Sequence, residues 1–337
     1  MRFHEIVLES EREELQSFLS GHGLQYEDDI DETLVLIEDE RIIATASSAK
    51  NIIKCIAVDE TYRGRNLLAT LMSEIIKRLA AKGIDHYFVY TYDEQAPMFK
   101  ALGMKPIVST MTLALLEGGA SIEETLADMK TRYRLGDERK ACVVLNANPL
   151  TNGHMHLIDE ASKSHERVIV FVVSEDRSAF AFEDRFKIVE KACATRKNVT
   201  VMPSGAYLVS YATFPKYFNV SETDIREEHA LIDVLVFKEH YMKTFNIVHR
   251  YVGEEPLSPM TDIYNDTMRK YLGDALTVIP RKTLGERVIS ASHVRSALAR
   301  GELDAIADDV PEATRSFLKT EAGRETLERI KRQRTRH

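Results

Sequence analysis

The sequence predicts an α/β protein of two domains, in which an α+β domain with a mostly antiparallel sheet precedes a domain with a doubly wound parallel sheet. Residues 33–58 hold short β-rich runs separated by polar turns, which is typical of an antiparallel meander. From residue 141 onward, strand-like and helix-like segments alternate, which indicates parallel strands joined by crossover helices. Between the two patterns, the pair Gly118-Gly119 precedes a capping-box sequence. We therefore predict domains at residues 1–118 and 140–337, joined by a connecting helix within 119–139.

The elements of the first domain follow from their apolar patterns. Three β-rich runs open it, at residues 33–37, 41–45 and 52–58. A helix is predicted over residues 67–81, because apolar residues recur at helical spacing and Gly83 follows them. The remaining predicted elements are a strand at 87–90, a helix at 97–102 and a last strand at 107–115.

This β-β-β-α-β-α-β order resembles the core of the GNAT acetyltransferase fold. Residues 58–68 are similar to the loop with which that family binds the pyrophosphate of acyl-CoA, and residues 98–104 are similar to a later element of the family. Asn66 and Leu68 stand where the family usually has Gly or Ala, and a side chain there narrows the approach of a phosphate to the backbone. We therefore expect a structural, regulatory or carrier-docking role for this domain, and we assign it no catalytic residue.

The second domain is predicted to alternate five strands with helices. The strands are expected at residues 141–145, 167–173, 199–202, 247–252 and 276–279. The helices are expected at residues 153–164, 183–194, from about 223, and at 260–271. In open parallel sheets, ligands bind at the carboxyl ends of the strands. The residues that follow each strand are therefore the candidates for a functional site.

Composition and charge exclude several classes of protein. The 337 residues are 44% hydrophobic and 29% charged, as in ordinary globular proteins. No apolar stretch approaches the roughly 20 residues of a membrane helix and no signal peptide is evident, so we expect a cytoplasmic protein without a membrane partner. The net charge of -8 gives no footprint for nucleic acid, and the basic tail at 329–336 is interpreted as a solvated helix end. The cysteines lack C-x-x-C spacing and are expected to be buried apolar residues, with no metal ligand predicted: Cys55, Cys142 and Cys193.

The most informative segment follows the first strand of the second domain and reads NANPLTNGH over residues 146–154. A strand here delivers a Gly-His pair to a helix N-terminus, where unpaired N–H groups and the helix dipole attract phosphate oxygens. An isolated Gly-His pair is also common as a helix cap, so its meaning depends on the rest of the chain. Residues 151–154 resemble the T/H-x-G-H signature of the Rossmann-like nucleotidylyltransferase superfamily, which binds ATP at this place. The resemblance implies catalytic roles for His154 and Thr151 and contacts to ATP from Asn146, Asn148, Pro149 and Gly153.

Polar residues also follow the other strands. Arg177 and Arg185 lie after the second strand, where either arginine could clamp a phosphate or pair with an acidic residue on the helix surface. Gly253 and Glu254 follow the fourth strand and are expected to contact the nucleoside, whose hydroxyls and amino group need acceptors. Arg281 follows the last strand and is a further candidate for ATP binding.

A second motif, ISASHVR, occupies residues 289–295. It resembles the I-S-S-T-x-[IV]-R signature of the same superfamily, in which hydroxyls and backbone at a second helix N-terminus hold the β- and γ-phosphates. The resemblance implies that Ser290 and Ser292 bind ATP and that Arg295 is catalytic. Two motifs about 140 residues apart, in the expected order, favour adenylyl transfer. Neither a G-x-x-x-x-G-K-[ST] loop nor an H-E-x-x-H motif is present in the sequence.

The aromatic segment at residues 205–218, together with the GNAT-like first domain, makes the chain resemble the citrate lyase ligase family over essentially its whole length. That resemblance implies that ATP and acetate form acetyl adenylate and pyrophosphate. The acetyl group then passes to the thiol of the phosphoribosyl-dephospho-CoA arm on the acyl-carrier subunit of citrate lyase. Mg²⁺ is expected to bridge the phosphates with few protein ligands. Three hydroxyl side chains of the segment are candidates for the acetate site: Tyr207, Ser210 and Thr213.

Two other functions remain open. An adenylyltransferase that acts on phosphopantetheine or a mononucleotide uses the same two motifs, but it usually lacks both the first domain and the aromatic segment. A regulatory protein that binds CoA or nucleotide without turnover would not need both ends of the triphosphate to be held. Acetate-dependent release of pyrophosphate, with AMP as the final nucleotide, distinguishes the ligase from both.

Overall fold

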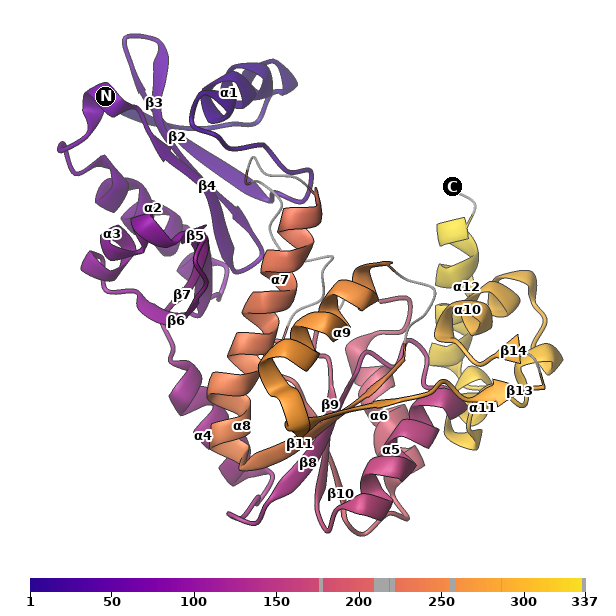
Figure 1. Ribbon diagram of the computed structural model, residues 1–337. Coiled ribbons are helices and arrows are strands. Elements are labelled where there is room, and N and C mark those ends of the chain that lie inside the picture. Colours follow the sequence, from indigo (N-terminus) through magenta and orange to yellow (C-terminus); the bar gives the residue numbers. More distant parts are fainter. Residues whose placement is uncertain (176–177, 209–217, 219–221, 255–258, 286, 335–337) are drawn as a thin grey trace. The chain divides into compact units, whose positions relative to one another are not determined.

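The structure is a computed structural model that describes residues 1–175, 178–208, 218, 222–254, 259–285 and 287–334 (Figure 1). Its contacts divide the chain into two compact units. The first unit is Met1–Thr125 with Tyr211–Ile232, and the second is Leu126–Ser210 with Asp233–His337. The first unit thus includes a later segment of the chain, residues 211–232, that the predicted domain limits did not contain. Those limits stay a prediction. No helix in the described part of the chain is long and apolar enough to cross a membrane.

The first unit is built on a seven-stranded sheet of order β1-β2-β3-β4-β5-β7-β6. Its strands are β1 (Arg2–Glu5), β2 (Glu32–Glu38), β3 (Arg41–Ala49), β4 (Ile52–Val58), β5 (Tyr87–Tyr92), β6 (Lys105–Ser109) and β7 (Leu113–Gly118). Its helices include α1 (Glu9–Gly21), α2 (Leu67–Ala81) and α3 (Ala96–Ala101). Neighbouring strands are antiparallel except β4 and β5, which pair in parallel at Ile52 with Phe88 and at Ile53 with Val89. The pairing ends there, so the two strands separate toward their carboxyl ends.

The predicted bounds of α2 are confirmed, because its buried residues recur at helical spacing: Leu67, Leu71, Met72, Ile75 and Leu79. The sequence prediction missed β1 and α1. The single strand predicted at 107–115 is wrong, since β6 and β7 are separate antiparallel strands. Thr110 forms the turn between them, because its hydroxyl accepts hydrogen bonds from the N–H groups of Thr112 and Leu113 at 3.1 and 2.8 Å. A β-branched residue in a β-rich run therefore concealed the turn.

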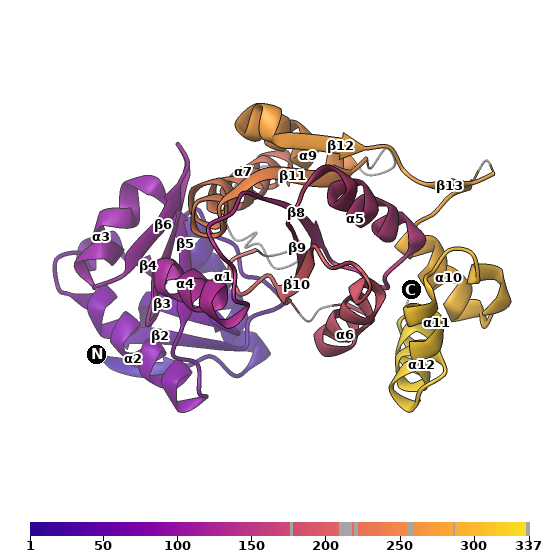
Figure 2. The ribbon, with the colours of Figure 1, turned by 90° about the horizontal axis from the view of Figure 1, so that it is seen from below.

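The second unit is built on a five-stranded sheet of order β10-β9-β8-β11-β12 in which every neighbouring pair is parallel (Figure 2). Its strands are β8 (Lys140–Leu145), β9 (Val168–Val172), β10 (Val199–Pro203), β11 (Ile247–Gly253) and β12 (Leu276–Ile279). The doubly wound parallel sheet predicted from the sequence is confirmed. Strand order reverses between β8 and β11, and this reversal is where open α/β sheets bind ligands.

Helices cover both faces of this sheet. Those of the second unit include α4 (Ile122–Arg132), α5 (Asn152–Ser164), α6 (Phe182–Cys193), the π-helical turn η3 (Phe237–Tyr241), α8 (Met242–Phe245) and α9 (Pro259–Leu272), whereas most of α7 (Glu222–Val236) belongs to the first unit. Val170 and Val172 of β9 belong to the core formed with α5 and α6. Phe171 points to the opposite face, where its ring lies 5.5 Å from that of Tyr241 and 5.6 Å from that of Phe245. Successive residues of a strand thus bury both faces.

After the sheet, the chain forms a short hairpin and further helices for which the sequence analysis gave no bounds. They are β13 (Thr283–Leu284), β14 (Arg287–Val288), α10 (Ala291–Arg300), α11 (Glu312–Leu318) and α12 (Glu321–Arg334). Val294, Ala297 and Leu298 of α10 join the core that includes α5 and α6. All three cysteines are buried and free, which confirms their expected role as small core residues.

Candidate active site

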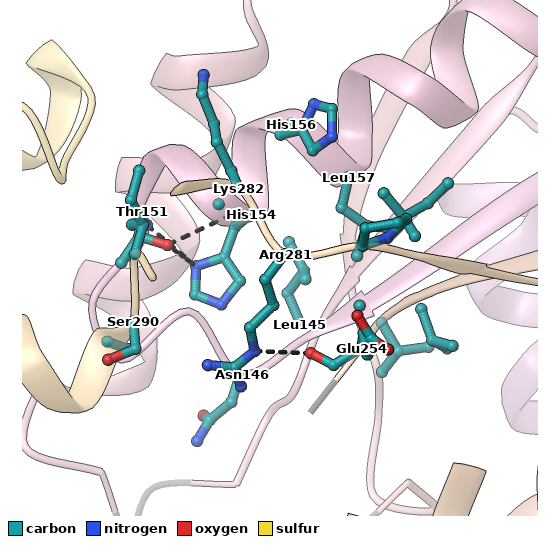
Figure 3. Close-up of a pocket in the computed structure, with 18 of the residues that line it drawn as sticks. Leu145, Asn146, Thr151, His154, His156, Leu157, Glu254, Arg281, Lys282 and Ser290 are labelled. Atoms are coloured by element: carbon teal, nitrogen blue, oxygen red, sulfur yellow. Dashed lines mark hydrogen bonds between the residues drawn. The ribbon is translucent and has the colours of Figure 1, made fainter. Parts of the chain in front are cut away.

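A cavity of about 530 Å³ opens at the carboxyl ends of β8 and β11, where the strand order reverses (Figure 3). Six segments line it: the end of β8, the start of α5, the end of β11, one side of α9, the residues after β12 and the start of α10. The lining includes these predicted site residues: Asn146, Thr151, Gly153, His154, Gly253, Glu254, Arg281, Ser290 and Ser292. The fold therefore brings most of the two motifs to one cavity.

The start of α5 is held by a reciprocal cap between Thr151 and His154. The backbone N–H of His154 donates to the Thr151 hydroxyl at 3.3 Å, and the backbone N–H of Thr151 donates to His154 Nδ1 at 3.0 Å. Since Nδ1 accepts a hydrogen bond, a neutral imidazole carries its proton on Nε2. Figure 3 shows the ring extending from this turn into the cavity. His154 therefore presents an N–H donor to whatever binds there.

His154 stays neutral at physiological pH. Burial, with a smaller contribution from the positive charge of Arg281, lowers the pKa of His154 from 6.5 to about 4. A histidine with that pKa is uncharged at pH 7, so it can donate a hydrogen bond without carrying a proton to be transferred. This state suits the stabilisation of a phosphate oxygen rather than acid catalysis.

The second motif lies directly against the first. Ser290 caps α10, because its hydroxyl accepts the backbone N–H of His293 at 3.1 Å. A Cβ added to Gly153 would lie 3.5 Å from the carbonyl oxygen of Ile289, so the two helix starts pass within van der Waals distance of each other. Two helix N-termini that face one cavity give it a positive potential, while the backbone N–H groups of Asn152, His154 and His293 already donate to acceptors within the protein.

Arg295 joins the two motifs instead of lining the cavity. Its Nη1 donates to the carbonyl oxygen of Asn148 at 2.5 Å, and its Nη2 donates to the Ser292 hydroxyl at 3.1 Å. Burial lowers the pKa of Arg295 below its usual value, although a guanidinium remains charged at neutral pH. The geometry supports a positioning role for Arg295, whereas the sequence predicted direct catalysis.

The segment before α11 also ties the motifs together. The backbone N–H of Asn152 donates to the Asp309 carbonyl at 2.7 Å, and its side-chain amide donates to the Asp308 carbonyl at 2.8 Å. The Asp309 side chain is fully buried and lies 2.9 Å from Arg287 of β14. The first turn of α5 and the hairpin before α10 are therefore anchored to one short segment.

Positive side chains follow β12 at the cavity. Arg281 and Lys282 both line it, and Arg281 Nε donates to the Glu254 carbonyl at 2.7 Å. Figure 3 shows the Arg281 side chain extending beside the His154 ring toward Asn146. The Glu254 side chain is exposed at the cavity edge. This set of donors and cations fits a polyphosphate.

Arg185 has a different role from the predicted phosphate clamp. It is fully buried, and its guanidinium donates to the carbonyl oxygens of Phe180, Asn146, Val173 and Glu175 at 2.6–3.1 Å and to the Asn146 side-chain oxygen at 3.1 Å. These bonds commit all three nitrogens to the protein. Arg185 therefore holds the loop that carries Asn146, and the prediction that it grips a phosphate does not fit this geometry.

Other predicted residues lie away from the cavity or outside the described residues. Asn148 accepts the backbone N–H of Phe180 at 3.1 Å through its side chain, and it precedes Pro149 across a cis peptide bond. Tyr207 is only 3% exposed and is not among the residues that line the cavity. Arg177, Ser210 and Thr213 lie outside the described residues, as does most of the aromatic segment.

Sequence reasoning missed one wall of the cavity. Arg250 of β11 and three residues of α9 line it: Tyr264, Asn265 and Met268. Arg250 is 3% exposed. A charged residue inside a strand that borders the switch point was the signal that could have identified it.

Comparisons with known proteins agree with this geometry. The family model described as the citrate lyase ligase C-terminal domain matches residues 140–318, and the GNAT acetyltransferase model matches residues 2–104. [Citrate [pro-3S]-lyase] ligase of Escherichia coli is 34% identical over 90% of this chain and 89% of its own length. The ligase of the same description from Haemophilus influenzae is 33% identical over 94% of this chain and 98% of its own length. Phosphopantetheine adenylyltransferase of Finegoldia magna is 37% identical over 19% of this chain and 41% of its own length.

Proposed function

Because the chain belongs to the citrate lyase ligase family, we propose that it uses ATP and acetate to acetylate the thiol form of the citrate lyase prosthetic group. The reaction passes through acetyl adenylate and yields AMP and pyrophosphate. One observation carries the adenylating half of this proposal: two helix N-termini, the neutral His154 and the cations Arg281 and Lys282 meet in one cavity. ATP carries several negative charges in its triphosphate, and this cavity supplies donors and positive charge for them.

In the first half-reaction, a carboxylate oxygen of acetate forms a bond to the α-phosphorus while the bond to the β-phosphate oxygen breaks. Acetate is already ionised at neutral pH, so no general base is needed. Negative charge grows on the α-phosphate, and the Nε2–H of His154 stabilises it. Arg281, Lys282 and the N-terminus of α10 hold the departing pyrophosphate. Positioning and charge stabilisation therefore supply the acceleration.

In the second half-reaction, the thiol sulfur bonds to the acetyl carbon while the bond to the AMP oxygen breaks. AMP is a good leaving group because its phosphate bears the departing charge. Mg²⁺ bound with ATP would neutralise part of the triphosphate charge, and we assign it no ligand among the described residues. We assign no residue as the base for the thiol.

The first unit is proposed to dock the carrier or its arm rather than to transfer acetyl groups from acetyl-CoA. A cavity of about 760 Å³ lies where β4 and β5 separate, and Asn66 and Leu68 line it. The ring of Phe218, which also lines this cavity, lies 5.1 Å from that of Tyr92. The side chains of Asn66 and Leu68 stand where a glycine-rich loop would present backbone N–H groups to a pyrophosphate.

The proposal is tested by incubating the full chain with ATP, acetate and the citrate lyase carrier subunit. We expect a mass gain of one acetyl group on the carrier, release of pyrophosphate and AMP as the final nucleotide. The likeness to phosphopantetheine adenylyltransferase favours one competing function, adenylyl transfer to phosphopantetheine. Formation of adenylylated phosphopantetheine (dephospho-CoA) and pyrophosphate, without acetate dependence, would establish that function instead.

A further inference from the structure

The cavity extends beyond the two motifs to a wall that the roles above leave unused. Arg250 of β11 and Asn265 and Met268 of α9 form this wall with Tyr264. Arg250, Asn265 and Met268 are 3%, 4% and 1% exposed. A buried cation and a buried amide on a cavity wall are costly features unless a ligand or a partner uses them.

The Arg250 guanidinium is fixed at one end. Its carbon lies 4.3 Å from the centre of the Phe237 ring and 5.8 Å from that of Tyr264. Its Nη2 donates to the Tyr264 hydroxyl at 3.1 Å, and that hydroxyl donates to the carboxylate of Asp233. Stacking and one hydrogen bond fix the plane of the guanidinium, and Asp233 balances its charge through the Tyr264 hydroxyl.

The other two nitrogens of Arg250 are unpaired. Nε and Nη1 are buried and have no hydrogen-bond partner within the described part of the chain. Arg185 offers a direct comparison, because it is also buried and all three of its nitrogens donate to acceptors within the protein. Arg250 therefore departs from the way this fold satisfies a buried arginine, and it does so at the cavity wall.

We propose that Arg250 is the carboxylate-binding residue of the acetate site, an assignment that rests on the proposed function. A planar carboxylate matches the hydrogen-bonding pattern of a guanidinium. The triphosphate already has its own donors at the α5 and α10 N-termini and at Arg281 and Lys282, so a second anion is the natural ligand of this wall. Val144, Val252 and Met268 line the cavity as well and would surround a methyl group.

Access to Arg250 requires a small local movement. Nε and Nη1 are both buried, so acetate reaches them when a lining side chain shifts. Met268 is suited to this, because its unbranched side chain adapts to irregular space. A site covered in this way also excludes bulk water from the bound carboxylate.

The test compares Arg250→Gln and Arg250→Lys with the full-length wild-type protein in acetate-dependent ATP–pyrophosphate exchange. Loss of hydrogen bonds to a charged group is expected to raise the KM for acetate roughly 10- to 100-fold in the Gln variant. The KM for ATP should change less than about twofold, because its donors are elsewhere. The Lys variant should be intermediate, since it keeps the charge but loses the planar fork. Arg269→Gln, on the exposed side of α9, is the control for removing an arginine.

A second measurement does not depend on turnover. Sodium acetate without ATP should raise the Tm of the wild type and of Arg269→Gln but not that of Arg250→Gln. Should the Gln variant fail to fold, the Lys variant carries both comparisons, because it keeps the charge that balances Asp233. Unchanged acetate KM in folded variants would overturn the assignment, as would a rise in the KM for ATP alone. If the wild type lacks exchange but shows Tm stabilisation that the variant loses, the proposed function fails while the carboxylate site stands.

Discussion

Replacing His154 by glutamine separates the two roles of this side chain at the start of α5. The native ring accepts the Thr151 backbone N–H at 3.0 Å through Nδ1, while Nε2 carries the proton that faces the cavity. Glutamine is a normal capping-box residue at this third helical position, so its side-chain oxygen can accept the same N–H. Alanine removes both the cap and the donor. The pair His154→Gln and His154→Ala therefore separates the cap from the imidazole.

The structure sets the size of each effect. Loss of one cap hydrogen bond should lower the free energy of unfolding by about 1 kcal/mol in the Ala variant, whereas the Gln variant should stay within about 0.5 kcal/mol of the wild type. Loss of a donor aimed at developing phosphate charge usually reduces kcat by about 10²- to 10³-fold, which is about 3 to 4 kcal/mol of transition-state stabilisation. Both variants should therefore be almost inactive, and only the Ala variant should be less stable.

Acetate-dependent ATP–pyrophosphate exchange measures the first effect, and urea unfolding measures the second. Near-normal exchange in the Ala variant would refute the donor role of Nε2, because alanine has no side-chain donor. An Ala variant that loses exchange while the Gln variant keeps it would show that the cap, together with an amide N–H in place of the imidazole, suffices for the reaction.

Four further outcomes are expected. As the pH falls from 6.5 to about 4, His154 becomes protonated in the unfolded chain but stays neutral in the folded protein. Up to about 3 kcal/mol of the free energy of unfolding should therefore be lost over that window. His154→Gln should remove this part of the pH dependence in urea unfolding. Arg295→Lys should lower kcat/KM for ATP, because one ammonium cannot hold both Asn148 and Ser292; unchanged ATP kinetics would contradict the bridge. Arg185→Lys should lower the free energy of unfolding by about 3 kcal/mol or more, and an unchanged urea midpoint would argue against its buried hydrogen bonds. Ser290→Ala should cost about 1 kcal/mol in the same assay and weaken ATP use, which steady-state kinetics would reveal.

Local patterns predicted the elements whose side chains have a regular environment. The apolar spacing of residues 67–81 matched α2, and the alternation after residue 141 matched a parallel sheet. The two phosphate motifs were predictable because a helix N-terminus binds anions through its own backbone. The turn at Thr110 was concealed, since a hydroxyl that caps a turn looks like any β-branched strand residue.

The arginines were harder to interpret from the sequence. Arg185 stands near acidic residues at a helix start, as a phosphate clamp would, yet the fold surrounds it with carbonyl oxygens from distant segments. Arg250 stands between polar and aromatic neighbours in β11, like an exposed strand residue, yet it is buried. The sequence shows that both residues are charged, whereas only the packing of several segments determines which arginine finds hydrogen-bond acceptors for all of its nitrogens.

The return of residues 211–232 to the first unit has a consequence for the order in which the chain is made. Thr110 donates to Glu228 at 2.7 Å, and Leu24 forms a β-bridge with Phe218, so the first unit makes these contacts only after β8, β9 and β10 have been synthesised. At usual rates of synthesis, about 5 to 20 residues per second, the ribosome needs roughly 5 to 20 s between Thr125 and Ile232. The N-terminal unit therefore cannot finish folding as an independent nascent domain, and a chain begun at Ser121 would leave part of α7 without its native neighbours.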